Sequence, residues 1–216
     1  MNCLNDSKTE FILFGTENDI DRVSGWTVSV GGAEIFPSRD ARNIGAFLDS
    51  GMKMTAQISN TIRACYCQLR SIAKIKKYLS KDAVVKLCHA FITSRIDNMN
   101  SLLYKIPDYQ QQKIQLILNN TARLIHRPEQ SGDTTALLKQ LHWLPVESRI
   151  EFKILLLVFK CLNEQAPAYL TDLLLPYKPG RDLRSARMEL LKESGSTKRY
   201  GERAFSRCGP KLWHAL

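Results

Sequence analysis

The sequence has no long hydrophobic run and no short motif of a hydrolase or a nucleotide-binding enzyme. Its longest purely aliphatic and aromatic run is Ile154 to Phe159, whereas a membrane-spanning helix needs about 20 apolar residues. No basic segment followed by an apolar one stands at the amino terminus, so we expect an intracellular protein of the cytoplasm or nucleus, neither secreted nor bound to a membrane. P-loop, G-x-S-x-G and H-E-x-x-H patterns are also absent, so neither independent enzymatic chemistry nor a small-molecule substrate is supported.

The cysteines show no C-x-x-C spacing, which argues against a zinc knuckle or a thioredoxin-like motif. Four of the six, Cys65, Cys67, Cys88 and Cys161, lie in apolar or helical stretches. We expect these four to be buried, reduced thiols. Cys88 precedes His89, but two adjacent residues make a poor metal site. The sequence therefore predicts no cofactor bound by this chain.

Charge is unevenly spread along the chain, whose net charge is +10. Residues 1–50 carry a net charge of −4, residues 51–177 carry +8 and residues 178–216 carry +6. An acidic first quarter followed by a basic remainder suggests that the later part meets a polyanion such as nucleic acid. A solvated basic surface without a partner is the alternative.

The first fifty residues show strand and turn patterns. Strands are predicted over Thr9–Thr16, Trp26–Val30, Ala33–Phe36 and Arg42–Asp49. Gly31 and Gly32 supply the positive-φ turn of a tight hairpin between the second and third of these. Gly45, inside the fourth, suggests a close approach of another backbone segment.

From Lys53 onwards the apolar period becomes helical. One face of the first helix collects Ile58, Ile62, Cys65, Leu69 and Ile72. Further helices are predicted over Lys81–Lys105 behind an N-cap at Ser80, Tyr109–His126, a short stretch from Asp133 to His142, Val146–Asn163 and Pro167–Leu175. Because Ile154–Phe159 is apolar on every side, we place its helix in the middle of the core. The predicted fold class is α+β, mostly α: a small antiparallel strand region, a helical bundle and an irregular basic tail.

Two basic groups are candidates for nucleic-acid binding, since that affinity comes mostly from phosphates and released counterions. The first is a stripe on the first long helix, formed by Arg63, Arg70, Lys74 and Lys77. The second is in the tail and comprises Arg181, Arg184, Arg187, Lys198, Arg199, Arg203 and Arg207. Either group is alternatively a solvated surface. Among the tail aromatics Tyr200, Phe205 and Trp213, stacking on bases competes with packing back on the helices.

Six blocks then occur in order: "NDSKTEFILFGT", "VGGAEIFPSRDARNIGAFLDS", "AFITSRIDNMNSLLYKIP", "LHWLPVESRIEFKILLLVFKCLN", "APAYLTDLLLPY" and "RYGERAFSRCGPKLWHAL". Together they resemble the carboxy-terminal part of the reverse transcriptase, an RNA-directed DNA polymerase, of non-LTR (LINE-type, jockey-like) retrotransposons. The resemblance covers nearly the whole chain. It implies a palm remnant over 1–50, a thumb-like helical bundle over 51–130, post-thumb helices packed on the bundle over 131–177, and a basic, partly irregular tail over 178–216.

The resemblance also implies roles for individual residues. Lys8 and Thr9, in "KTEF", match the palm motif that follows the catalytic Asp-Asp strand, where Lys8 takes the place of a lysine thought to assist nucleotide addition. Arg42, Asn43 and Gly45, in "RNIGAFLD", resemble the primer grip, a hairpin that positions the 3′ end of the primer. The thumb of this family tracks the template–primer duplex, so the implied partner is an RNA or DNA duplex.

The chain departs from the family at the chemistry. The F/Y-A-D-D turn expected immediately before Leu4 is missing, and no Asp-Asp pair occurs anywhere in the sequence. The family uses Mg²⁺ held by such carboxylates, and Asp19 with Asp21, in a predicted loop, is a poor substitute. We therefore expect a truncated remnant that is not an enzyme by itself but keeps nucleic-acid-binding potential. The alternative is a helical protein-interaction module with no nucleic-acid role, and the oligomeric state is left open.

Overall fold

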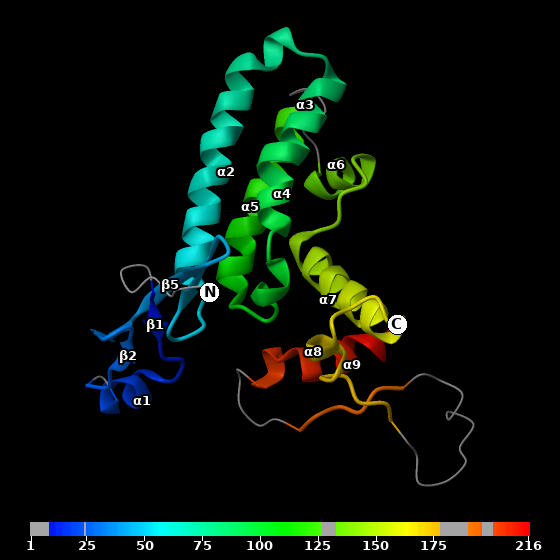
Figure 1. The fold of residues 1–216 in the computed structure, drawn as a ribbon. Helices are drawn as coiled ribbons and strands as arrows, with labels where there is room; N and C mark the ends of the chain where they lie inside the picture. Colours follow the sequence, from blue (N-terminus) through cyan, green and yellow to red (C-terminus); the bar gives the residue numbers. More distant parts are fainter. Residues whose placement is uncertain (1–8, 24, 127–132, 178–189, 196–200) are drawn as a thin grey trace.

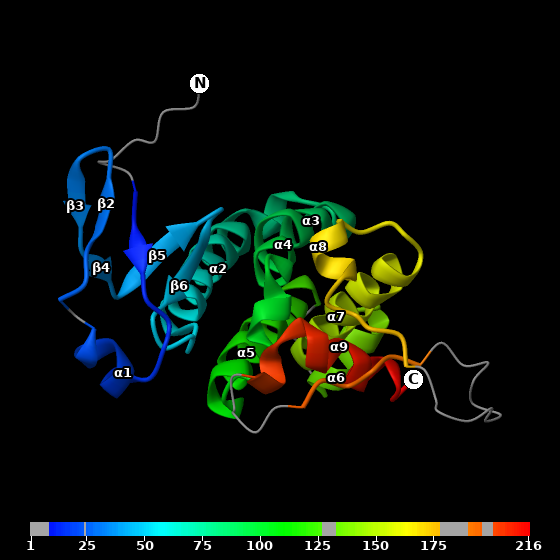
Figure 2. The same cartoon turned by 60° about the horizontal axis from the view of Figure 1, so that its bottom comes forward.

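The computed structural model describes residues 9–23, 25–126, 133–177, 190–195 and 201–216. Its strands are β1 (Phe11–Ile12), β2 (Val28–Val30), β3 (Ala33–Ile35), β4 (Pro37–Ser38), β5 (Asp40–Asn43) and β6 (Ala46–Asp49). Its α-helices are α1 (Glu17–Arg22), α2 (Thr55–Ile75), α3 (Lys81–Cys88), α4 (Ser94–Asp97), α5 (Asp108–Ile125), α6 (Thr134–Gln140), α7 (Val146–Leu162), α8 (Ala168–Thr171) and α9 (Phe205–Trp213). Strands gather near the amino terminus and helices dominate the rest (Figures 1 and 2), which confirms the predicted fold class.

The strands form three separate two-stranded sheets beside the amino-terminal end of α2 (Figure 1). β1 pairs with β4 in parallel, while β2–β3 and β5–β6 are antiparallel hairpins. Gly31 and Gly32 have positive φ angles in the β2–β3 turn, as predicted. The strand predicted over Thr9–Thr16 is wrong beyond β1, because Thr16 instead caps α1 by accepting a hydrogen bond from the Asp19 amide.

The segment predicted as one strand over Arg42–Asp49 is a turn with a strand on each side. Ile44 and Gly45 occupy the turn with φ angles of 47° and 84°, as in the turns that suit two-residue hairpins. An ideal Cβ added to Gly45 would meet no atom within 4 Å. The expected close backbone approach is therefore wrong, and the glycine is explained by its positive φ.

The β-branched side chain of Ile44 is unfavourable at this turn position. It is 84% exposed and so gains little burial in exchange for a left-handed backbone. We predict that Ile44→Asn raises the free energy of unfolding by about 1 kcal/mol, because asparagine tolerates this conformation. Urea denaturation measures the change. The control is Val28→Asn, at an exposed strand position in the neighbouring hairpin, which should not raise the free energy of unfolding. Equal effects of the two substitutions would show that the backbone at Ile44 is not strained.

α2, the α3–α4 segment and α5 form an elongated antiparallel bundle (Figure 1). On α2 the predicted apolar face points inward: Ile58, Cys65 and Ile72 are buried and Ile62 and Leu69 are partly buried. The largest cluster of buried side chains runs from Met54 to Ile154 and also includes Cys208. The core thus crosses the predicted 130/131 boundary between thumb-like and post-thumb helices without a break.

The single helix predicted over Lys81–Lys105 is interrupted. Ser80 caps its start by accepting the Ala83 amide, as predicted, but a π-helical turn at His89–Thr93 separates α3 from α4. There the Thr93 hydroxyl donates to the His89 carbonyl and the Ser94 hydroxyl to the Ala90 carbonyl, the kind of side-chain bond that bends helices. Phe91 and Leu102, two apolar residues of the predicted helix, are exposed.

α7 lies at an edge of the bundle and not at its centre, so that prediction is also wrong. One of its faces is buried and comprises Val146, Ile150, Ile154, Val158 and Cys161. Its opposite face leaves Phe152 56% and Phe159 47% exposed. The centre of α7 is therefore apolar on every side, but among the described residues only one face of the helix is covered.

α9 packs on α7 at the carboxyl end of the described chain (Figure 2). This helix was not predicted within the tail. Cys208, Gly209 and Pro210 are buried, and Phe205 and Trp213 pack against the hydrophobic clusters. Of the two alternatives for the tail aromatics, packing holds for Phe205 and Trp213, while Tyr200 lies outside the described residues.

The thiols of Cys65, Cys88 and Cys161 are buried and free, as predicted. The predicted burial of Cys67 is wrong, because this residue is exposed. Burial raises the pKa of Cys65, Cys88 and Cys208 from 9.0 to about 11 each. Burial disfavours the thiolate, so these groups stay protonated at neutral pH.

The raised thiol pKa values predict a loss of stability at alkaline pH. Between pH 9 and about 11 the unfolded chain releases thiol protons that the folded chain retains. The free energy of unfolding therefore falls as pH rises through this window, and the contribution of the thiols to it is complete below pH 9. Urea titrations at both ends measure the fall. The Cys65→Ala/Cys88→Ala variant should be less stable throughout yet show a smaller fall; an unchanged fall would contradict the assignment to these thiols.

Candidate nucleic-acid interface

The outward face of α2 carries exposed cations and no acid. No aspartate or glutamate occurs anywhere in Thr55–Ile75. Arg63, Arg70 and Lys74 are exposed on the side turned away from the buried face, and Lys77 is exposed in the 3₁₀ turn that follows. The structure thus brings together the four residues of the predicted basic stripe, here called the α2 stripe.

None of these four side chains forms an ion pair with any described carboxylate. Arg70 Nε donates to the Tyr66 carbonyl at 3.3 Å, and Lys77 Nζ lies 4.8 Å from the centre of the Tyr78 ring. The stripe extends over about 21 Å at 1.5 Å per residue. That length matches about six phosphates of one strand of a duplex, at about 3.4 Å each.

Lys76 lies next to the stripe in sequence but points into the bundle. Its ammonium group donates to the carbonyls of Leu124 and His126, at the carboxyl end of α5. A cation at this end of a helix satisfies carbonyls that have no partner within the helix. Lys76 therefore joins α2 to α5 and is not part of the α2 stripe.

The predicted primer-grip-like residues lie together in the β5–β6 hairpin. The Arg42 amide donates to Glu10 Oε2 at 3.0 Å, and its guanidinium lies 5.4 Å from the centre of the Phe47 ring. Asn43 ends β5, and Gly45 lies in the exposed turn. The guanidinium is thus held against the hairpin's own aromatic ring.

The hairpin is attached to the base of α2. The Phe47 amide donates to Gln57 Oε1 at 3.0 Å, and Ala46 is buried. Thr9 is partly buried just before β1. Lys8, the other residue of the palm motif, lies outside the described residues.

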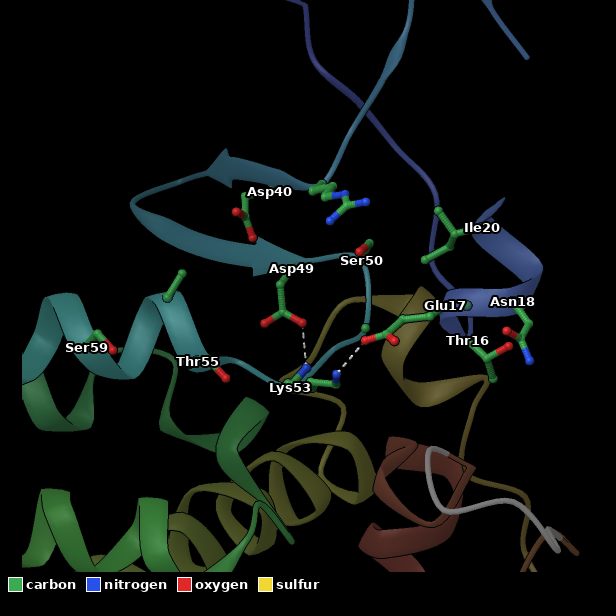
Figure 3. Close-up of a pocket in the computed structure, with 14 residues that line it drawn as sticks. Thr16, Glu17, Asn18, Ile20, Asp40, Asp49, Ser50, Lys53, Thr55 and Ser59 are labelled. Carbon is green, nitrogen blue, oxygen red and sulfur yellow. Dashed lines mark hydrogen bonds and ion pairs between the residues drawn. The ribbon is translucent and has the colours of Figure 1, made fainter. Parts of the chain in front are cut away.

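An open pocket of about 720 Å³ separates the hairpin from α1 and the base of α2 (Figure 3). Asp40 and Asp49 are partners across the β5–β6 ladder, and Asp49 Oδ1 accepts the Lys53 amide at 2.6 Å. Glu17, from α1, forms an ion pair of 3.1 Å with Lys53. Figure 3 shows the three carboxylates beside the pocket. Among the described residues, Oδ2 of Asp49 is buried and has no hydrogen-bond partner.

The acidic pocket and the α2 stripe share one face of α2. Ser59 lines the pocket and precedes Arg63 by four residues, which places the two on the same side of the helix. At its base, this face of α2 therefore adjoins three carboxylates of other segments, which share the pocket with Arg39 and Lys53, while above Ser59 it carries cations and no acid. Because carboxylates repel phosphates, a bound nucleic acid would contact α2 from Arg63 upward.

Two of the basic tail candidates form structural contacts: Arg203 joins the tail to the bundle, and Arg207 bonds within the tail. Arg203 donates to the carbonyls of Met52 at 2.6 Å and Leu102 at 2.5 Å. Arg207 donates to the Ser194 carbonyl at 2.6 Å and lies 3.9 Å from Glu202. The other tail candidates, Arg181, Arg184, Arg187, Lys198 and Arg199, lie outside the described residues.

Sequence reasoning missed two features of this interface. The first is the absence of acidic residues from α2, which the spacing of the cations does not reveal. Cys67 was placed in the core, although it lies four residues after Arg63 and three before Arg70, which is the spacing of one helix face.

Comparison with protein-family models, with curated proteins and with solved structures finds no match to this chain. Across the described segments, no group of three or more histidine, cysteine or acidic side chains is arranged to hold a metal ion. In the same segments, every helix is too short or too polar to cross a membrane.

Proposed function

We propose that this chain is a thumb-like nucleic-acid-binding remnant of a non-LTR retrotransposon reverse transcriptase, which holds an RNA or DNA duplex along α2 and does not extend a primer by itself. The observation that carries the binding is the α2 stripe: exposed cations on a helix with no acidic residue. The six sequence blocks support the origin. A hairpin docked on the base of the same helix is consistent with both.

The expected binding is weak and independent of sequence. The stripe offers side chains to phosphates, and phosphate contacts carry no information about base identity. Non-specific contacts of this kind give dissociation constants of about 10⁻⁴ to 10⁻⁶ M at physiological salt. With four phosphates neutralised on B-DNA, the logarithm of the binding constant should fall with the logarithm of salt concentration with a slope of about −3.6.

Fluorescence anisotropy of a labelled primer–template duplex tests the proposal. We expect binding at low salt, a steep loss as salt is raised, and affinities for two unrelated sequences that agree within about threefold. The same preparation, given Mg²⁺ and deoxynucleotides, should add nothing to the primer. Absence of duplex binding at low salt would contradict the binding role, and primer extension would contradict the inactivity.

The alternative is a helical protein-interaction module with no nucleic-acid role. Salt separates the two functions, because apolar docking does not weaken steeply with ionic strength whereas phosphate binding does. The exposed cations on an acid-free helix favour the nucleic-acid function for the α2 face.

A further inference from the structure

The outer face of α7 carries apolar side chains where a bundle helix would ordinarily be polar. Phe152 and Phe159 are 56% and 47% exposed, and Leu155 and Leu156 between them are partly exposed. At 100° per residue these four lie within one side of the helix, opposite the buried residues Ile150, Ile154 and Val158. We call Phe152, Leu155, Leu156 and Phe159 the outer α7 face.

This face is more than scattered exposed apolar residues, which are normal on protein surfaces. Its members are spaced by three and four residues along one helix, the spacing of side chains that bind a helix in a groove or a second helix. α5, α8 and α9 contact α7, and the hydrophobic clusters include its residues Ile150, Ile154 and Val158 but none of the outer α7 face. Figure 1 places α7 on the far side of the bundle from α2. The face is therefore spatially separate from the α2 stripe.

Charge beside the face indicates what covers it. Lys153 and Lys160 border it on one flank and form no ion pair with any described residue. Arg149, on the same flank, is held by Asp97 at 2.7 Å. Acidic groups on a partner would complement the two lysines.

A second copy of this chain fits less well. Antiparallel pairing of two α7 helices through a two-fold axis would place each lysine flank beside the same flank of the other copy. The chain's net charge of +10 adds repulsion between copies.

We propose that the outer α7 face is a docking surface for a short amphipathic helix of another protein, one with an apolar stripe and acidic residues beside it. The partner's apolar side chains pack between Phe152 and Phe159, and its carboxylates lie against Lys153 and Lys160. This surface goes beyond duplex binding, because the two functions use opposite sides of the bundle and can fail separately.

A designed probe tests the proposal on the full chain. The probe is a labelled helical peptide of about 16 residues with leucine along one face and glutamate elsewhere, and its matched counterpart carries lysine in place of glutamate. We expect the glutamate peptide to bind at least about tenfold more tightly than the lysine peptide. Equal affinities, or no binding of either peptide, would overturn the proposal.

Substitutions then locate the site. The variant Phe152→Glu/Phe159→Glu should no longer bind the glutamate peptide. Leu116→Glu, at a 49% exposed position on α5, should bind it as the unmodified chain does. Lys153→Glu/Lys160→Glu should reverse the preference between the two peptides, which a loss of folding cannot do. If Phe152→Glu/Phe159→Glu binds the glutamate peptide as tightly as Leu116→Glu and the unmodified chain do, the outer α7 face is not the contact surface.

Sedimentation velocity and duplex anisotropy distinguish the other occupants. The proposal predicts that the chain without peptide stays monomeric at micromolar concentration and that Phe152→Glu/Phe159→Glu binds duplex as before. A dimer abolished by that variant would assign the face to a second copy, and lost duplex binding would assign it to nucleic acid. Either result overturns the proposal.

Discussion

Reversing the charge of Arg63, Arg70 and Lys74 to glutamate is expected to weaken duplex binding at low salt by at least about 100-fold. Each reversal removes an attraction of about 1 kcal/mol at contact distance in water and adds a repulsion of similar size. The salt slope should flatten as well, because fewer counterions are released. Fluorescence anisotropy at several salt concentrations measures both quantities.

The control for this variant is Lys113→Glu/Lys139→Glu/Lys192→Glu. These lysines are exposed and lie outside the α2 stripe, and their reversal lowers the net charge by the same amount. We expect it to reduce binding by less than about tenfold through the overall field. Equal losses in the two variants would show that net charge, and not the α2 stripe, determines binding.

Replacing Gly209 by valine is expected to lower the free energy of unfolding by about 2–3 kcal/mol. A Cβ at this position would lie 3.0 Å from Val158 Cγ2, 3.4 Å from Leu174 Cδ2 and 3.5 Å from Phe205 Cε2. Valine adds two methyl groups beyond that contact. Because valine is a better helix former than glycine, the helix itself gains, and the loss reports the clash between α9 and α7.

Gly195→Val is the matched control for this prediction. A Cβ at Gly195 would meet no atom within 4 Å, and substitutions at such exposed positions usually change stability by less than about 0.5 kcal/mol. Urea denaturation of both variants measures the difference. Equal midpoints would contradict the close packing of α9 on α7.

Local signals predicted much of the fold. The step of four, three, four and three from Ile58 to Ile72 predicted the buried face of α2. Ser80 caps the helix that it was expected to cap, and the short helix predicted from Asp133 begins behind an Asp133 cap. Gly31 and Gly32 marked a hairpin turn correctly. Each of these depends on residues close together in the chain, where spacing and cap chemistry decide the outcome.

The features that were mispredicted depend on distant contacts. Gly209 and Pro210 resemble helix breakers, yet both lie inside α9. The missing Cβ at Gly209 lets this helix approach α7 closely. The apolar run of α7 does not reveal which of its faces meets the core. At the candidate site, cation spacing predicted the α2 stripe, but the pocket with Asp40 and Asp49 required the hairpin to fold against α2, which no local pattern specifies.

Cys67 offers the most direct test of the α2 interface, because its exposed thiol stands between Arg63 and Arg70. The measurement is the rate of iodoacetamide alkylation of Cys67, followed by peptide mass spectrometry with and without saturating primer–template duplex at low salt. We predict that duplex slows alkylation of Cys67 severalfold and that added salt restores the rate of the free protein. An unchanged rate while the duplex is bound would show that nucleic acid does not lie along α2.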